Sequence, residues 1–176
     1  MRPFLRDQPD DLQLFACEVE QLQAEIEDAR LAGDEARLLA ALGRAGDLCR
    51  ALGQSRRAVD ALEEAVALAR TERDRARLAA NLIRLGTAFQ YADEHATAER
   101  FLREALALAE AEGLGPYVGF ACQHLGKCLA EQGRYGEARD AFDRALGVRQ
   151  EAGDRDLAAS TRRALELLDR VEARAQ

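Results

Sequence analysis

The stretch Leu82-Ile83-Arg84-Leu85-Gly86-Thr87-Ala88-Phe89 decides the fold, because its pattern recurs forty residues earlier and forty residues later. The counterparts of Leu82, Leu85, Gly86 and Phe89 are Leu42, Ala45, Gly46 and Cys49 upstream, and Cys122, Leu125, Gly126 and Leu129 downstream. A second set keeps the same step: Ala58, Ala98 and Ala138; Leu62, Leu102 and Phe142; Ala65, Ala105 and Ala145. A fixed period of this length is typical of a stacked array, in which each unit packs against its neighbours.

The spacing within each set indicates helices. Offsets of 3, 4 and 7 from Leu82 place the first set on one helical face, and the second set follows the same rule. A glycine inside a helix costs roughly 1 kcal/mol relative to alanine. Gly86 therefore indicates a place where two helix backbones approach closely, and each unit is predicted to be a pair of packed helices.

On these residues the chain resembles the tetratricopeptide repeat family, in which Leu-Gly and an aromatic residue mark the first helix and two alanines around a large residue mark the second. The third unit matches best, with Leu125-Gly126 and a turn at Gly133-Arg134-Tyr135. The first unit departs most, with Ala45 and Cys49 in the leucine and aromatic places, and the second has Asp93 where a turn glycine is expected. The usual repeat has about 34 residues, so the longer step is similar to the long-repeat variety of adaptor proteins and bacterial regulators.

The resemblance implies an all-α fold, a right-handed α-solenoid of about seven helices with a terminal capping helix. The predicted boundaries are a disordered lead-in over 1–10 and a single domain over 11–176. That domain comprises an N-terminal helix over 11–32, repeats over 33–73, 74–113 and 114–153, and the capping helix over 154–176. Gly33-Asp34 and Gly153-Asp154 are predicted to end one helix and cap the next, and Asp74 to provide a cap alone.

The two outer helices carry their own signals. Apolar residues from Leu12 to Ala29 recur at steps of three and four, a short heptad pattern for which packing on the first repeat is favoured over a coiled coil. In the last helix, Arg162 and Glu166 occupy the places of the large apolar residue and the small glycine. Such polar substitutions predict an outer face that faces water, as terminal units of solenoids require.

Composition excludes several classes of function. The 176 residues carry a net charge of −7, which argues against general affinity for nucleic acid. No segment predicts a signal peptide or a membrane span, so a cytoplasmic location is expected. Cys49 and Cys122 fall on apolar repeat positions and are interpreted as core residues, and His124 with Cys128 is a weak metal signal. We therefore expect no cofactor and no metal.

Catalytic patterns are missing from the sequence. With His95 and His124 as its two histidines, the chain lacks Gly-x-Ser-x-Gly and His-Glu-x-x-His motifs. The glycine-rich segment 113–119 lacks the Gly-Lys-Ser/Thr ending of a phosphate loop and is better explained by a helix stop before Pro116. The protein is predicted not to be an enzyme.

The face of each first helix that points away from the packed positions lines the concave groove in the resembling family. Carried onto this sequence, the candidate binding residues are Arg44, Asp47, Arg50, Ile83, Arg84, Thr87, Gln90, Tyr91, Phe120, Gln123, His124, Lys127 and Glu131. Some members of the family hold a peptide carboxylate with lysine and asparagine at set groove positions. Gly43 and Asp47 take the first two of those positions here, so that clamp is not expected.

The groove residues lead to a functional hypothesis. Apolar and aromatic side chains stand among four basic residues, opposed by Asp47 and Glu131. This mixture favours a scaffold that binds a protein or peptide segment of acidic or amphipathic character. The alternatives are a merely solvated face, a structural or self-associating array that forms a homodimer, the sensor domain of a larger bacterial-type regulator, and a receptor for a small molecule or peptide signal.

Overall fold

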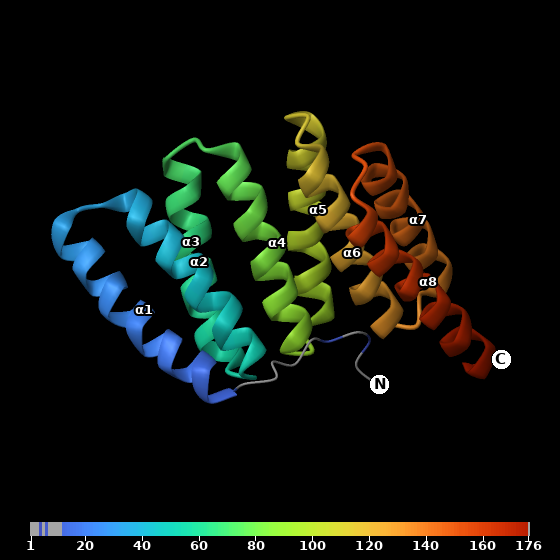
Figure 1. Cartoon of the computed structure of the whole chain (residues 1–176), viewed down its shortest axis with the longest axis horizontal. Coiled ribbons are helices and arrows are strands. Elements are labelled where there is room, and N and C mark those ends of the chain that lie inside the picture. Colours follow the sequence, from blue (N-terminus) through green and yellow to red (C-terminus); the bar gives the residue numbers. More distant parts are fainter. Residues whose placement is uncertain (1–3, 5, 7–11, 176) are drawn as a thin grey trace.

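The computed structural model describes residues 4, 6 and 12–175, and this part of the chain folds into eight helices and no strand (Figure 1). In order they are α1 (Leu12–Ala32), α2 (Glu35–Ala51), α3 (Ser55–Thr71), α4 (Arg75–Tyr91), α5 (His95–Ala111), α6 (Gly115–Glu131), α7 (Tyr135–Glu151) and α8 (Arg155–Ala175). The predicted helical solenoid is confirmed, with one helix more than the approximate count of seven. Each of the six middle helices has 17 residues, so the repeat in sequence is a repeat in structure.

Close approach of the two helices within each pair explains the recurrent glycine. A Cβ atom added to Gly86 would lie 2.7 Å from Leu102 Cγ and 3.1 Å from the carbonyl oxygen of Ala98. The same contact recurs at 2.4 Å between Gly46 and Leu62, and at 2.7 Å between Gly126 and Phe142. A larger residue at any of these glycines would push the two backbones apart.

The turn within each helix pair uses a residue in the left-handed region of backbone conformation. Gly53 and Gly133 have φ of 72° and 76°, and Asp93, which replaces the glycine in the second unit, has φ of 62°. Aspartate enters this region more readily than most residues. Asp93 therefore keeps the turn while adding a carboxylate at the end of α4.

The predicted helix caps are confirmed. Asp34, Asp74 and Asp154 each accept a hydrogen bond from the backbone N–H three residues later, at 2.9–3.0 Å. Pro116 lies in the first turn of α6, after Gly113 has ended the preceding helix with φ of 65°. These caps satisfy backbone donors that a helix start leaves unpaired.

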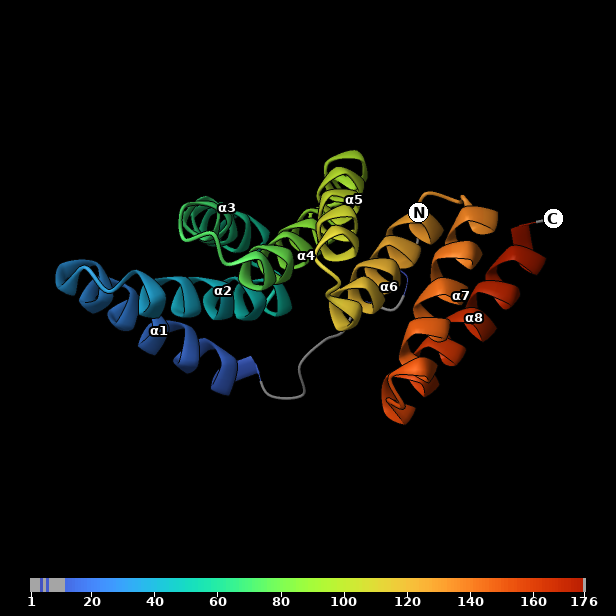
Figure 2. The ribbon, with the colours of Figure 1, turned by 90° about the horizontal axis from the view of Figure 1, so that it is seen from above.

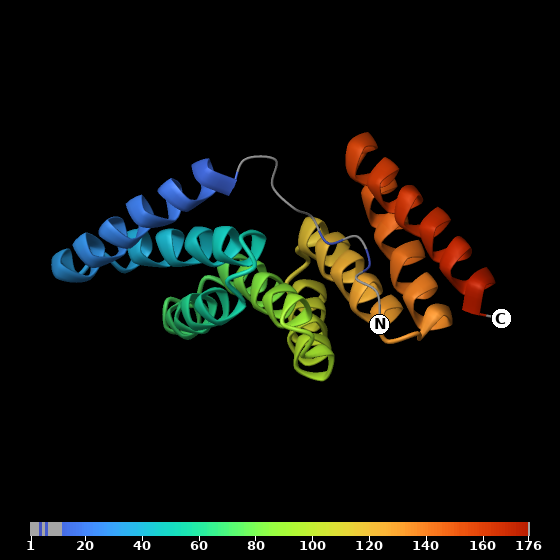
Figure 3. The same ribbon diagram turned by 90° about the horizontal axis from the view of Figure 1, so that it is seen from below.

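The first helices of the three units form one layer. Contacts join α2 to α4 and α4 to α6, while each also packs on the second helix of its own unit. Figures 2 and 3 show this row with α1 and α8 at its two ends, and α3 and α5 together on one side of it. The exposed side of α2, α4 and α6 is hereafter called the concave face. None of the described helices is long and apolar enough to cross a membrane.

The two outer helices close the array differently from the middle ones. In α8, Ala158, Thr161, Ala164 and Leu168 are buried, whereas Arg162 and Glu166 are exposed. Most of the predicted lead-in over 1–10 lies outside the described residues. Phe4 and Arg6, which are described, differ from that expectation because both are placed against α6.

Candidate binding groove on the concave face

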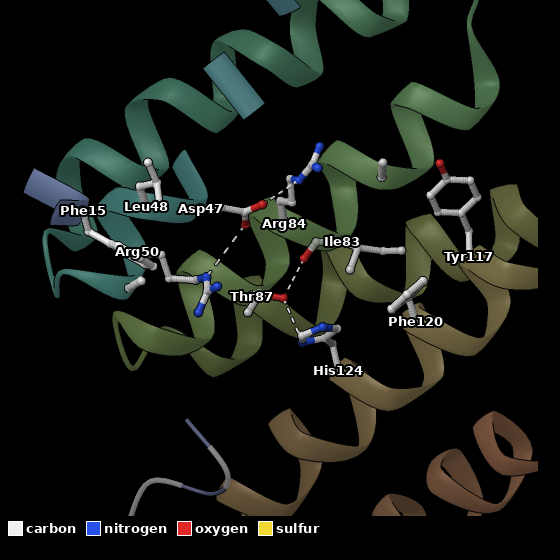
Figure 4. A pocket seen from close by; sticks show the side chains of 12 residues that line it. Phe15, Asp47, Leu48, Arg50, Ile83, Arg84, Thr87, Tyr117, Phe120 and His124 are labelled. Carbon is white, nitrogen blue, oxygen red and sulfur yellow. Dashed lines mark hydrogen bonds and ion pairs between the residues drawn. The ribbon is translucent and has the colours of Figure 1, made fainter. Parts of the chain in front are cut away.

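A pocket of about 460 Å³ opens on the concave face between α1, α2, α4 and α6 (Figure 4). Most of its wall is apolar or aromatic, from Phe15, Leu48, Ala51, Ala80, Ile83, Tyr117 and Phe120. The polar lining residues are Asp47, Arg50, Arg84, Thr87 and His124. Seven of the thirteen candidate residues named from the sequence therefore line one cavity: Asp47, Arg50, Ile83, Arg84, Thr87, Phe120 and His124. The size and the mixture of groups suit a bound side chain or a short segment.

The charges of this pocket, hereafter the α2–α4 pocket, are not balanced among its described lining residues. The Asp47 carboxylate lies 2.9 Å from Arg84 Nε and 4.0 Å from Arg50 Nε (Figure 4). The second distance is too long for a hydrogen bond. Arg50 Nε is buried and has no hydrogen-bond partner among the described residues, and its guanidinium stacks 4.6 Å from the centre of the Tyr91 ring. One carboxylate thus serves two guanidinium groups.

His124 contributes a neutral imidazole to the pocket wall. Burial, followed by nearby cations of which Lys127 has the largest effect, lowers the pKa of His124 from 6.5 to about 3. Thr87 Oγ1 donates to the Ile83 carbonyl at 2.8 Å, so His124 Nδ1, 3.1 Å from the same oxygen, must be the donor to it. That leaves the lone pair on Nε2, and the ring adds no positive charge at neutral pH.

A second hollow of about 410 Å³ adjoins the first and includes Arg44, Arg77 and Asn81 in its wall. Arg44 is exposed and forms an ion pair with Glu18 of α1. Arg77 forms ion pairs with Glu72 and Asp74. The positive charge predicted for this part of the groove is therefore partly neutralised by carboxylates, one of which comes from α1.

The remaining candidate residues lie outside the two hollows. Gln123 is buried and accepts a hydrogen bond from Arg149 Nη1 at 3.0 Å. Lys127 is half-buried on α6. Gln90 was expected on the groove surface but is fully buried, and neither polar atom of its side chain has a partner among the described residues. Gln90 lies on the packed side of α4, and this side includes more positions of the helix than the apolar pattern of the sequence implies.

Glu131 and Tyr91 belong to a separate place at the end of α4 and α6. Glu131 is buried, 2% exposed, and its carboxylate pairs with Arg6 at 2.9 Å. The Tyr91 ring lies between two cations, because Arg6 is 5.3 Å and Arg50 is 4.6 Å from its centre. Glu131 therefore does not oppose the groove arginines, as the sequence suggested, but binds a residue that precedes α1.

Sequence reasoning missed Phe15 and Tyr117 as pocket residues and Arg6 as a partner of Glu131. Phe15 belongs to the apolar stripe of α1 that was assigned to packing on the first repeat. The pattern gave no signal for Arg6, since its contacts span 125 positions. The aromatic character of Tyr117, within the glycine-rich segment, was the available signal at that position.

The four cysteines are free thiols. Cys49, Cys122 and Cys128 are buried thiols and Cys17 is an exposed one. Burial raises the pKa of Cys128 to about 11, and its Sγ donates to the His95 carbonyl at 3.6 Å. Within the described residues, no group of three or more His, Cys, Asp or Glu side chains is arranged to hold a metal ion.

Comparison with family models finds the repeat directly. A model described as "Tetratricopeptide repeat" matches residues 37–111, and a second one with the same description matches residues 119–147. These two segments include the Leu-Gly positions of all three units. No curated protein matches the sequence.

Solved structures share the arrangement of helices. BtubC (BKLC) from P. vanneervenii has a TM-score of 0.76 at 21% identity, over 88% of this chain and 65% of its own length. Aspartyl phosphate phosphatase F from Bacillus subtilis has a TM-score of 0.73 at 17% identity, over 97% of this chain and 49% of its own. The de novo designed helical repeat protein DHR81 has a TM-score of 0.53 at 18% identity, over 92% and 91%. At these identities the likeness is one of fold alone.

Proposed function

Because the chain belongs to the tetratricopeptide repeat family, we propose that it is a non-catalytic interaction module that binds a segment of another protein on its concave face. Solenoids of this kind present an extended concave surface built from the first helix of every repeat. The chain spans 65% and 49% of the first two similar structures, so a module within a larger assembly is part of the proposal.

The observation that supports this proposal is the α2–α4 pocket. It lies on the inner layer, it is large enough for one or two side chains, and its wall is mostly apolar. Removing apolar side chains of a partner from water there would contribute roughly 25 cal/mol per Å² buried. The Thr87 hydroxyl of the lining donates its proton to the Ile83 carbonyl and accepts a hydrogen bond from His124 Nδ1, so His124 is not placed to act as its base.

The chemistry of the pocket favours an amphipathic partner segment that carries an acidic group. Arg84 is hydrogen-bonded to Asp47, whereas Arg50 lies 4.0 Å from it and its buried Nε–H has no partner in the described part of the chain. A carboxylate of the partner would pair with the Arg50 guanidinium, and a charge-assisted hydrogen bond of this kind is roughly twice as strong as a neutral one. Apolar neighbours of the carboxylate would fill the space against Ile83 and Phe120.

Ala80 offers a test because its small, half-buried side chain lines both hollows. Ala80→Glu would compete for the arginines and repel an acidic segment, so capture of the partner from an extract of the source cells should fall by roughly tenfold or more, which corresponds to about 1.4 kcal/mol. Ala80→Lys adds a charge of the same sign as the pocket arginines, so this variant should capture more of the partner than Ala80→Glu does. Quantitative mass spectrometry of the captured proteins gives the comparison.

The matched control is Ala67→Glu, which places the same charge at an exposed alanine of α3. It should leave both capture and melting temperature unchanged. Equal capture by Ala80→Glu, Ala80→Lys and Ala67→Glu would contradict the proposal that the α2–α4 pocket holds an acidic partner segment.

A further inference from the structure

Arg6 is bound by the helical array through an unusually complete set of acceptors. Its Nε and Nη2 atoms donate to the two carboxylate oxygens of Glu131, both at 2.9 Å. Nη2 also donates to Asp93 Oδ1 at 2.6 Å and to the Gln90 carbonyl at 3.0 Å, and Nη1 donates to the Tyr91 carbonyl at 3.2 Å. A bidentate arginine–carboxylate pair of this kind fixes the orientation of the guanidinium as well as compensating its charge.

The groups that surround the Arg6 guanidinium favour a cation. Gln90 and Tyr91 are the last two residues of α4, where helix carbonyls have few partners within the helix and the helix dipole is negative. Asp93 adds its charge from the left-handed turn that follows. The Tyr91 ring lies 5.3 Å from the guanidinium carbon, which adds a cation–π contact.

The Phe4 side chain lies in an adjacent apolar environment. Its side chain is 4% exposed, and its ring stacks on Phe142 of α7 with 6.0 Å between the ring centres. The Phe4 backbone N–H donates to Glu131 Oε1 at 2.8 Å. Glu131 therefore binds both the main chain at the aromatic residue and the side chain of the arginine two positions later.

These features are particular to the end of the array. The residues equivalent to Glu131 in the first two units are Ala51 and Tyr91, and those equivalent to Phe142 are Leu62 and Leu102. Among the described residues, Glu131 forms an ion pair with Arg6 at 2.9 Å, and His95 Nδ1 lies 3.7 Å from the same carboxylate. The guanidinium that matches its carboxylate comes from a segment 125 positions away in the sequence.

We propose that Glu131, Asp93, the end of α4 and Phe142 form a binding site for a segment with an aromatic residue followed two positions later by arginine, and that the chain's own Phe4 and Arg6 occupy it as a resident competitor. A partner with the same pattern binds by displacing them. The site is separate from the α2–α4 pocket and opposite to it in charge preference. The inference stands whether or not that pocket binds an acidic segment.

Phe4 and Arg6 belong to the same chain as the site, so they act as a tethered ligand. A tethered ligand makes the same contacts as a free one, and the tether changes only its effective concentration. A partner therefore has to compete against that concentration. Weakening the resident segment should open the site to a peptide supplied in solution.

The test uses the full chain carrying Phe4→Ala and Arg6→Glu, called the released variant. The probe is a fluorescently labelled peptide of residues 1–10, Met-Arg-Pro-Phe-Leu-Arg-Asp-Gln-Pro-Asp, and binding is measured by fluorescence anisotropy. We expect the released variant to bind one peptide, and the wild-type chain to bind it at least roughly tenfold more weakly because its site is filled. Peptides with Arg6→Glu or with Phe4→Ala should each lose roughly tenfold or more in affinity.

Glu131→Gln, added to the released variant, should reduce peptide affinity by roughly tenfold or more, because it removes the charge of the carboxylate that binds both parts of the motif. The matched control is Glu63→Gln at an exposed position of α3, which should change nothing. The inference is overturned if the folded released variant binds no peptide, if the wild type binds as tightly, or if Glu131→Gln has no effect.

Two further outcomes are also decisive. If the wild type sediments as a dimer and the released variant as a monomer, Phe4 and Arg6 occupy the site of a second copy of the chain. That result would contradict the proposal that they compete within one chain. If the released variant is not helical by circular dichroism, Phe4→Ala alone takes its place in the binding experiment. If that variant also fails to fold, Phe4 is part of the core and the site is not one that a partner can use.

Discussion

Replacing Gly86 with leucine is expected to lower the free energy of unfolding by roughly 3 kcal/mol, at the upper end of the usual cost of overpacking. The first added atom would already lie 2.7 Å from Leu102 Cγ and 3.1 Å from the Ala98 carbonyl oxygen, and the leucine adds three more carbons beyond it. The backbone oxygen cannot rotate away, so α4 and α5 have to separate. For a domain of this size, such a loss lowers the melting temperature by roughly 6–12 °C.

The control for this substitution is Gly147→Leu in α7. A Cβ at Gly147 would meet nothing within 4 Å, and the residue has helical neighbours on both sides. Leucine is a better helix former than glycine, so this change should leave stability unchanged or raise it by roughly 0.5–1 kcal/mol. Equal melting temperatures for the two variants, measured by circular dichroism, would contradict the close packing of α4 on α5.

Removing residues 154–176, which include α8, is expected to cause the protein to aggregate. The buried residues of α8 include Thr161, Ala164 and Leu168, and they cover α7. Arg149 of α7 is also buried, and its Nη1 donates to Thr161 Oγ1 at 2.5 Å and to the Leu157 carbonyl at 3.1 Å. Without α8, an apolar helix face and a guanidinium that lost these acceptors would be open to water and to other copies.

Sedimentation velocity at several protein concentrations measures this effect. Two single substitutions in the full chain separate the covered face from the outer one: Leu168→Asp should destabilise the protein, whereas Glu166→Ala, on the exposed side, should not. A shortened protein that stays monomeric and fully helical would show that α8 is not needed to cover α7.

The repeat architecture could be predicted because its determinants are local and recur. The glycine at Gly86 and the alanine at Ala98 appear at the same step in every unit, so three weak signals reinforce one another. The caps at Asp34, Asp74 and Asp154 were predictable for the same reason. The left-handed turn at Asp93 was marked in the sequence by its alignment with the turn glycines.

The candidate site could be predicted only in part, because its contacts cross from one unit to another. Helical periodicity identified the face that carries Arg50, Ile83 and Phe120, and these residues do line the same pocket. It could not show that Arg44 pairs with Glu18 of α1, or that one carboxylate serves two arginines. The net charge of a surface depends on partners that a single helix does not reveal.

The placement of Arg6 on Glu131 lay furthest from what the sequence could show. The contact joins a segment before the first helix to the third repeat, with no periodic pattern at either end. A buried carboxylate at Glu131 is costly unless it is paired, so burial and pairing had to be seen together. The burial of Glu131 and its pairing with Arg6 are both properties of the folded chain.

The central claim is that the concave face, and not the outer one, receives a segment of another protein. Site-specific photo-crosslinking tests it directly, with a benzophenone amino acid placed at Ala80 in the α2–α4 pocket or at the exposed Ala67 of α3. After irradiation in extract of the source cells, we predict that the Ala80 protein forms a covalent adduct with a distinct polypeptide, joined through a segment that contains acidic and apolar residues. The same adducts from both positions, or adducts from Ala67 alone, would contradict the account.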